Sequence, residues 1–278
     1  MARLGPDRPN HLRYELVEPV RIFEQNLEGS DNSGKDFADH RFVDVSFRYA
    51  NLERTIFSHS QFWNTDLTGV NLSKANLQNC HFTNCKMDGA NLAEAVLDSS
   101  TGTVSMIGCN LTGANLYNIK MQNMVMNGSD FTNANMYMAN LLSADLSKSN
   151  FTGANLIWSF LDEADLSGSN FRQANLSSAS LRVTTIHGAI FAESILIGAR
   201  FRGADISGGT EVNFMGADAS YADFGHTNLE YARFCGARLN KTNFCGAKLL
   251  GTDFWGTDLR YANFEDADTS QAKIPPAG

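Results

Sequence analysis

Three acidic residues stand close together in the chain, Asp162, Glu163 and Asp165, and Asp145 lies twenty residues before the last of them. Paired carboxylates can perform acid–base chemistry or bind a cation. The interpretation that we favour instead is that these side chains point outward on a solvated wall. The six histidines are scattered, and no nucleophile elbow, phosphate loop or HExxH motif is present. We therefore expect a protein that is not an enzyme, with no catalytic residue, no metal and no cofactor.

The elements that position these residues follow from a hydrophobic residue at every fifth position. The series runs from Leu52 and resumes at Met106 after a delay of four residues. It continues to Ile206, and after a delay of three residues it runs from Phe214 to Phe264. A period of five fits neither the helical period of about 3.6 nor the strand period of about 2. It indicates an internal repeat.

Most repeats have a small residue two positions before the hydrophobic one, as at Ala75, Ala90 and Ala114, and often Asn or Asp directly before it. In extended chain, residues two apart point the same way, so the small and the large residue face inward and the Asn or Asp faces water. Glycine and polar residues follow, and they allow the chain to turn a corner. Four repeats per turn predict a roughly square coil, with residues twenty apart stacked about 4.8 Å above one another.

This stacking predicts columns of inward side chains that continue across both delays if the extra residues loop out. The first column contains Phe131, Phe151, Phe171, Phe191, Phe214, Phe234 and Phe254. The same column runs back through Leu111, Met87, Leu67 and Phe47, and Phe224, Phe244 and Phe264 lie opposite it. Two insertions that preserve register indicate loops on one continuous solenoid.

The repeats resemble the A(D/N)LXX motif of the pentapeptide repeat family. Examples are Ala50-Asn51-Leu52, Ala90-Asn91-Leu92, Ala144-Asp145-Leu146, Ala164-Asp165-Leu166 and Ala222-Asp223-Phe224. The resemblance implies an all-β fold, the right-handed quadrilateral β-helix, in agreement with the geometry above. About eleven coils at about 4.8 Å each predict a rod on the order of 55 Å long.

The predicted domain organisation has three parts. Residues 1–34 form an N-terminal capping segment, residues 35–268 form the β-helix with loop insertions near 98–105 and 207–212, and residues 269–278 form a short C-terminal tail. Some family members dimerise through a hydrophobic C-terminal helix, which this tail lacks. Because the ends of a solenoid expose unpaired edges, we expect a monomer or an end-to-end homodimer.

Composition restricts the partners and the compartment. The net charge of −8 and the absence of a basic stripe argue against direct binding of nucleic acid. Cys80, Cys85 and Cys109 occupy small-residue positions, and reduced thiols in the core are typical of a reducing compartment. The sequence shows no signal peptide and no apolar run of eighteen residues, so we expect a cytoplasmic protein that does not enter a membrane.

Aromatic and aliphatic residues at outward positions predict a surface for protein binding. We call six of them the apolar patch: Tyr117, Tyr137, Met138, Ile157, Trp158 and Phe160. Cross-coil stacking between neighbours would explain them equally well. Trp255 and Tyr261 belong to two smaller outward groups near the C-terminal end.

Acidic residues gather between positions 111 and 170. We call five of them the acidic wall: Asp130, Asp145, Asp162, Glu163 and Asp165. Certain pentapeptide repeat proteins are acidic rods that mimic duplex DNA, bind DNA gyrase or topoisomerase IV and protect them from poisons such as quinolones. The resemblance thus implies a protein-binding solenoid with topoisomerase as the most specific partner and antibiotic or toxin resistance as the outcome. The alternative is a structural scaffold or adaptor with no topoisomerase role.

Overall fold

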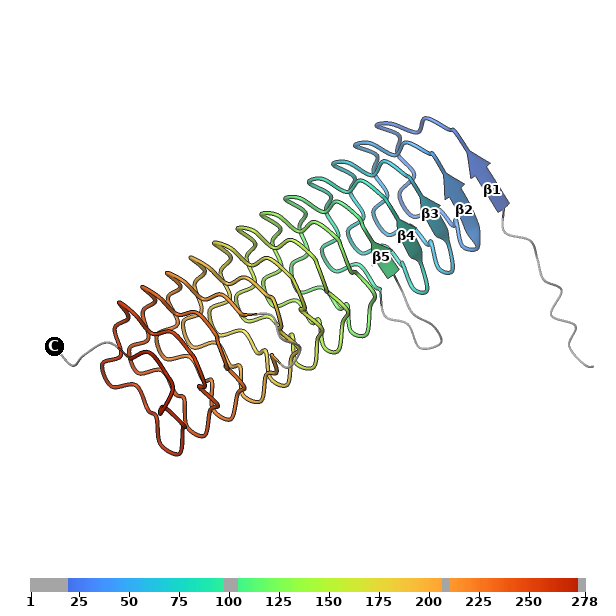
Figure 1. Cartoon of the computed structure of the whole chain (residues 1–278). Coiled ribbons are helices and arrows are strands. Elements are labelled where there is room, and N and C mark those ends of the chain that lie inside the picture. Colours follow the sequence, from blue (N-terminus) through green and yellow to red (C-terminus); the bar gives the residue numbers. More distant parts are fainter. Residues whose placement is uncertain (1–19, 98–104, 207–210, 275–278) are drawn as a thin grey trace, which may run out of the picture.

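The computed structural model describes residues 20–97, 105–206 and 211–274, which wind into an elongated stack of coils (Figure 1). Within these residues there is no helix, and so no helix long and apolar enough to cross a membrane. Five short strands form one parallel sheet in sequence order: β1 (Val20–Phe23), β2 (His40–Val43), β3 (Gln61–Trp63), β4 (His81–Thr83) and β5 (Ser105–Ile107). The predicted all-β, right-handed quadrilateral β-helix is confirmed; the number of coils stays a prediction.

The coils are stacked in the register that the repeat predicts. In the sheet, Phe42 of β2 pairs with Phe62 of β3, and Phe62 pairs with Phe82 of β4. Beyond β5 the same parallel pairing continues as isolated bridges, such as Asn115 with Asn135 and Asn135 with Asn155. Each coil therefore hydrogen-bonds to the coils before and after it.

The corners are tight turns around the hydrophobic residue of each repeat. At Leu111, the backbone N–H of Ala114 donates to the carbonyl of Leu111 at 3.0 Å, and Gly113 between them has a φ of 65°. A left-handed residue at the third position defines a type II turn and favours Gly or Asn. This requirement explains why glycine recurs two positions after the hydrophobic residue.

The Asn and Asp residues that precede the hydrophobic position close a second set of turns and also link the coils. The side-chain oxygen of Asn135 accepts the N–H of Tyr137 at 3.4 Å and the amide of Asn155 at 3.1 Å, while its own amide donates to Asn115 at 3.3 Å. An Asx turn of this kind favours Asn and Asp for its first residue. The side chains therefore form a ladder parallel to the rod axis.

Replacing Asn135 with Ala is expected to lower the free energy of unfolding by about 1–2 kcal/mol, because three hydrogen bonds are lost in the middle of the ladder. Urea denaturation followed by circular dichroism measures the change. Asn263 is the matched control, since it lies near the end of the rod and makes only two such bonds, to Asn243 and from the N–H of Glu265. Equal losses for Asn135→Ala and Asn263→Ala would contradict a role for the ladder in joining coils.

The core is built from inward columns of the predicted residues. Phe171, for example, has no exposed surface and stacks on Phe151 at 4.6 Å and on Phe191 at 4.8 Å between ring centroids. Small residues two positions earlier fill the remaining space, and their hydroxyls donate to carbonyls of the preceding coil, as Thr242 does to Ala219 at 2.9 Å. The interior is therefore filled by side chains and satisfied in hydrogen bonds at this position.

Both predicted insertions preserve the register of the coils. Ser105 of β5 pairs with His81 of β4 across the first insertion, and Phe214 stacks on Phe191 at 5.0 Å across the second. Residues 98–104 and 207–210 lie outside the described residues. The last residue of each predicted insertion belongs to the coils and not to a loop. Ser105 is part of strand β5, and the side chain of Val212 is fully buried.

Parallel pairing extends beyond the predicted solenoid boundaries at both ends. Val20 pairs with His40, and Ile22, Leu27 and Phe37 pack against the core, so residues 20–34 belong to the first described coil. At the other end, Lys273 pairs with Asp253. Residues 1–19 and 275–278, which contain the rest of the predicted cap and tail, lie outside the described residues.

Candidate functional site

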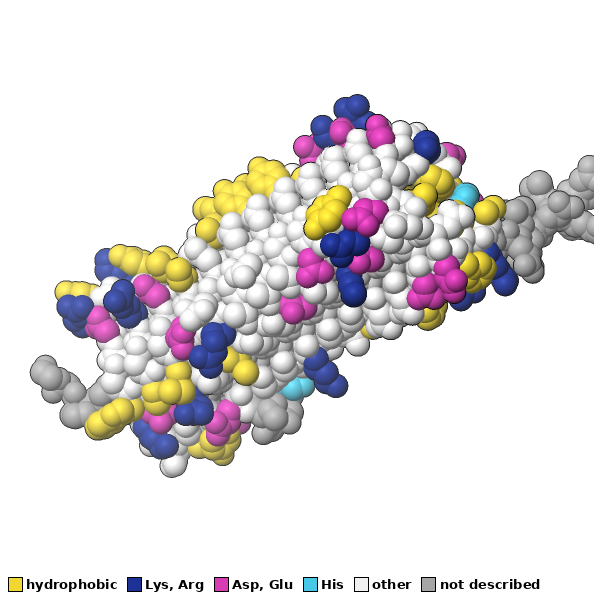
Figure 2. Space-filling model, turned by 90° about the horizontal axis from the view of Figure 1, so that it is seen from above, with side chains coloured by type: hydrophobic (Ala, Val, Ile, Leu, Met, Phe, Trp, Pro, Cys, Tyr) yellow, Lys and Arg dark blue, Asp and Glu magenta, His cyan; other side chains and the backbone are white. Residues whose placement is uncertain are grey.

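The structure brings the six residues of the apolar patch together on neighbouring coils. Tyr117 and Tyr137 stack with their ring centroids 5.8 Å apart and their planes 3° apart. The N–H of Met138 donates to the carbonyl of Ile157 at 3.0 Å, which places Ile157 directly after Tyr137 in the same column. Met138 and Trp158 form the adjacent column, and Phe160 follows two residues later in the next repeat. The view in Figure 2 shows that hydrophobic side chains on the rod's exterior gather in short rows along its axis.

Four members of the apolar patch are exposed to solvent. The exposed fractions are 44% for Tyr117, 41% for Met138, 48% for Trp158 and 51% for Phe160. Met138 and Trp158 also have left-handed backbone conformations, with φ of 59° and 60°. Bulky side chains are rare in the left-handed conformation, so at Met138 and Trp158 the residue type runs against the preference of the backbone.

Three other left-handed aromatic residues, Tyr49, Tyr221 and Tyr231, have a visible structural explanation. The ring of Tyr49 lies over Gly69, where a built Cβ would come within 2.4 Å of it, and the ring of Tyr231 lies over Gly251 in the same way. The ring of Tyr221 faces the ammonium group of Lys241 at 5.2 Å. Trp158 makes no ring contact with another described aromatic or cationic side chain. A signal for such positions exists in the sequence, namely a bulky residue where most repeats have Gly, Asn or Ser.

The acidic wall is divided between several sides of the rod. Asp145 pairs with Asp165, so these two carboxylates lie one above the other. Asp162 and Glu163 lie in the repeat directly before Asp165, and these four residues flank one corner. Asp130 pairs instead with Asn110 and Asn150, in a different column. The five residues therefore do not form a single flat acidic face.

Hydrogen bonds of the acidic wall show that most of its carboxylates stabilise turns. Asp130 accepts the N–H of Thr132 at 2.9 Å, and Asp145 accepts that of Ser147 at 3.0 Å. Asp165 binds Ser167 in the same manner. These bonds satisfy the backbone at corners and agree with outward side chains on a solvated wall.

The other two carboxylates of the acidic wall bond to neighbouring coils. Asp162 accepts the N–H of Arg182 at 2.9 Å and forms an ion pair with its guanidinium at 3.4 Å. Glu163 accepts a hydrogen bond from the hydroxyl of Ser143 at 3.1 Å. Each of the two therefore links its own coil to an adjacent one.

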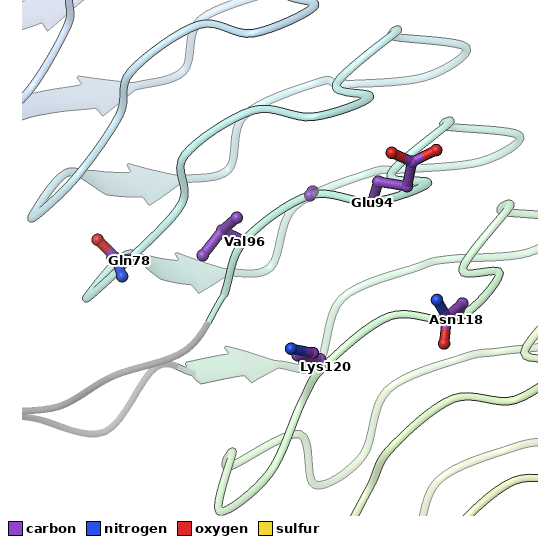
Figure 3. Close-up of a pocket in the computed structure, with 6 residues that line it drawn as sticks. Gln78, Glu94, Val96, Asn118 and Lys120 are labelled. Carbon is purple, nitrogen blue, oxygen red and sulfur yellow. The ribbon is translucent and has the colours of Figure 1, made fainter.

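A hollow lies in the wall of the rod near the first insertion. Its volume is about 280 Å³, and it spans three successive coils (Figure 3). Glu94 and Lys120 supply one carboxylate and one amine, and Gln78, Ala95, Val96 and Asn118 complete the lining. The lining contains no hydroxyl, thiol or imidazole that could act as a nucleophile or base. In the described part of the chain, no group of three His, Cys, Asp or Glu residues is placed to hold a metal ion.

Two of the buried cysteines, Cys80 and Cys109, are packed in the core as neutral thiols. The thiol of Cys80 donates to the carbonyl of Phe57 at 2.9 Å, and burial raises the pKa of this thiol to about 12. A hydrogen bond with Cys85, together with burial, raises the pKa of Cys109. Neutral thiols are poor nucleophiles and poor metal ligands, so these residues act as small core side chains.

The repeat and the geometry together identify the family. Models of pentapeptide repeats match the chain over most of its length. The model of the pentapeptide repeat region matches residues 35–103, and the model of eight pentapeptide repeats matches residues 109–147, 149–185, 169–208, 213–249 and 237–273. The chain belongs to the pentapeptide repeat family.

Solved structures of pentapeptide repeat proteins are similar to the chain. HetL, a protein involved in heterocyst differentiation regulation in the cyanobacterium Nostoc sp. strain PCC 7120, is 25% identical over 90% of this chain and 87% of its own, with a TM-score of 0.33. Full-length QnrB1, a plasmid-mediated fluoroquinolone resistance protein, is 16% identical over 90% of this chain and 95% of its own, with a TM-score of 0.24. No curated protein matches the chain.

Proposed function

We propose that this protein is a non-catalytic binding solenoid that docks a protein partner on the apolar patch. The observation that carries this proposal is the pair Met138 and Trp158, two bulky residues in left-handed conformations that are 41% and 48% exposed. Strained and exposed hydrophobic residues favour a role in binding over a role in the fold. Phe160 extends the same surface around the corner. Loss of partner binding when Tyr137 and Trp158 are replaced tests the proposal directly.

DNA gyrase or topoisomerase IV is the most specific partner for such a solenoid in the cytoplasm. The stacked pair Asp145 and Asp165 supports this assignment, because it repeats a negative charge from coil to coil in the way that phosphates repeat along DNA. Carboxylates that are hydrogen-bonded in turns are held in place, which favours mimicry of a fixed pattern of charge. In this form of the proposal, the protein occupies the DNA-binding surface of the enzyme and protects it from poisons such as quinolones.

A supercoiling assay with purified DNA gyrase tests the topoisomerase assignment. Micromolar protein is expected to restore supercoiling in the presence of a quinolone or to inhibit it in the absence of one. The control is Asp145→Asn with Asp165→Asn, which removes two charges but preserves the side-chain oxygens that accept the backbone N–H groups. Full activity of gyrase at every protein concentration, with and without the drug, would exclude gyrase as the partner.

The structural scaffold remains the second candidate, and the burial of the last described coil favours it. The terminal inward residues Leu259, Phe264 and Ala267 are only partly buried, so the last described coil exposes part of the core. An uncovered end of a solenoid invites end-to-end association. Light scattering that rises with concentration would support a self-associating scaffold, whereas a constant monomer mass would exclude it.

A further inference from the structure

A basic hollow lies on the wall of the rod, one coil beyond Asp162 and Glu163. Its volume is about 410 Å³, and it is lined by Arg182, Val183, Arg202, Gly203 and His226. It differs from the apolar patch in chemistry and lies on later coils. The stretch 171–210 that supplies most of its lining has four arginines against Glu193 and Asp205, within a chain whose net charge is −8.

The register of the coils explains how the basic hollow forms. The N–H of Val183 donates to the carbonyl of Arg202 at 3.1 Å, and the N–H of Gly203 donates to that of Gly225 at 3.3 Å. Arg182 and Arg202 therefore lie one above the other in one column. Val183, Gly203 and His226 follow one another in the adjacent column. Because Gly203 has no side chain, a gap remains between the side chains of Val183 and His226.

The two arginines of the hollow differ in their partners. Arg182 is held by Asp162, with Nε to Oδ2 at 3.4 Å, and this ion pair fixes its guanidinium. Among the ion pairs of the described residues, none involves Arg202, whose side chain is exposed. Glu163, the other nearby acid, accepts a hydrogen bond from Ser143 in the preceding coil, on the side away from the hollow. One guanidinium is thus positioned and a second is free to bind an anion.

We propose that the basic hollow binds a phosphate group, with Arg202 as the principal ligand and Arg182 and His226 beside it. The planar fork of a guanidinium matches two oxygens of a phosphate, and Arg is favoured over Lys where such recognition occurs. Val183 is 63% exposed and has a φ of 58°, a conformation that is an outlier for a β-branched residue, and it forms the apolar rim of the hollow. This rim leaves room for the carrier of the phosphate. The proposal is independent of the apolar patch and of topoisomerase binding.

Isothermal titration of the full chain with inorganic phosphate and with O-phosphoserine tests the proposal. We expect saturable binding that weakens with added sodium chloride, because exposed charges are screened. Arg202→Gln should weaken it about tenfold, the effect of losing a charge-assisted hydrogen-bonded pair. Equal affinity for both probes would identify the free ion as the occupant, and tighter binding of O-phosphoserine would identify a phosphorylated carrier.

Two further variants separate loss of the hollow from loss of the fold. Gly203→Asn fills the gap with a residue that tolerates a left-handed φ, and a Cβ there meets only Val183, at 3.7 Å. Its control is Gly236→Asn, at a glycine with φ of 70° and no atom near the Cβ position. Arg238→Gln, which removes an exposed arginine paired with Asp218, is the charge control. Absence of saturable phosphate binding by the wild type, or equal affinity for wild type, Arg202→Gln and Gly203→Asn, would overturn the proposal.

Discussion

Replacing Phe171 with Ala is expected to lower the free energy of unfolding by about 3–5 kcal/mol, the loss typical of a buried aromatic ring. The ring has no exposed surface and lies between Phe151 at 4.6 Å and Phe191 at 4.8 Å. Its removal leaves a cavity in the middle of a column that runs through both halves of the rod. Because each coil contacts only its neighbours, the defect should also uncouple the coils on its two sides.

Urea denaturation followed by circular dichroism measures both effects of the Phe171→Ala variant. A single unfolding transition in the wild type should become two, or one at a clearly lower midpoint. Trp255→Ala is the matched control, since Trp255 is a large aromatic residue of the same rod but is 66% exposed, and it should change the midpoint little. A loss smaller than about 1 kcal/mol for Phe171→Ala would contradict a close-packed, continuous core.

The inward-facing residues of the coils, and the register in which the coils stack, could be predicted from the sequence. Phe191 and Phe214 stack across an insertion of three residues because the hydrophobic series resumes at the position that keeps the column intact. Glycine at the corners was equally readable, since the left-handed third residue of the turn selects for it. Both features depend on local geometry that every repeat shares.

The predicted beginning of the solenoid, residue 35, follows a polar residue that interrupts the hydrophobic series. Asn32 occupies an inward position and is buried, and its side chain accepts a hydrogen bond from the ammonium of Lys35 at 2.7 Å and donates one to the hydroxyl of Ser30 at 2.6 Å. Those partners satisfy the amide of Asn32 in the first described coil. Ile22, Leu27 and Phe37 keep the five-residue spacing of the hydrophobic series on both sides of Asn32.

The grouping of side chains on the outside of the rod was harder to predict than the core, because outward positions share no common residue pattern. The sequence pattern grouped Asp130 with Asp145 and Asp165, whereas the pairing places Asp130 in a different column. The basic hollow was not predicted, although the net positive charge of residues 171–210 is visible in the sequence. Its shape depends on Gly203 lying between Val183 and His226, which only the register of the coils reveals.

The double variant Tyr137→Ser with Trp158→Ser is expected to lose partner binding by on the order of a thousandfold, if each aromatic residue contributes about 2 kcal/mol as a typical hot spot does. The fold should tolerate both changes. Ser177 lies in the column of Tyr137 two coils later, and Ser178 follows Trp158 by one coil with a φ of 58° that matches the 60° of Trp158. The variant therefore removes the apolar surface without a change in turn geometry.

The matched control for this experiment is Trp255→Ser with Tyr261→Ser. It removes two aromatic side chains that are 66% and 80% exposed, at the other end of the rod. Thermal unfolding of both double variants should follow the wild type closely, which establishes that any loss of binding arises at the surface.

The most direct test is a capture experiment in which the immobilised wild type and the two double variants are exposed to the same cell extract, with purified DNA gyrase as a defined probe. We predict that a protein retained by the wild type and by the Trp255/Tyr261 variant is not retained by the Tyr137/Trp158 variant. Retention of every captured protein by the Tyr137/Trp158 variant, at wild-type affinity, would contradict recognition through the apolar patch.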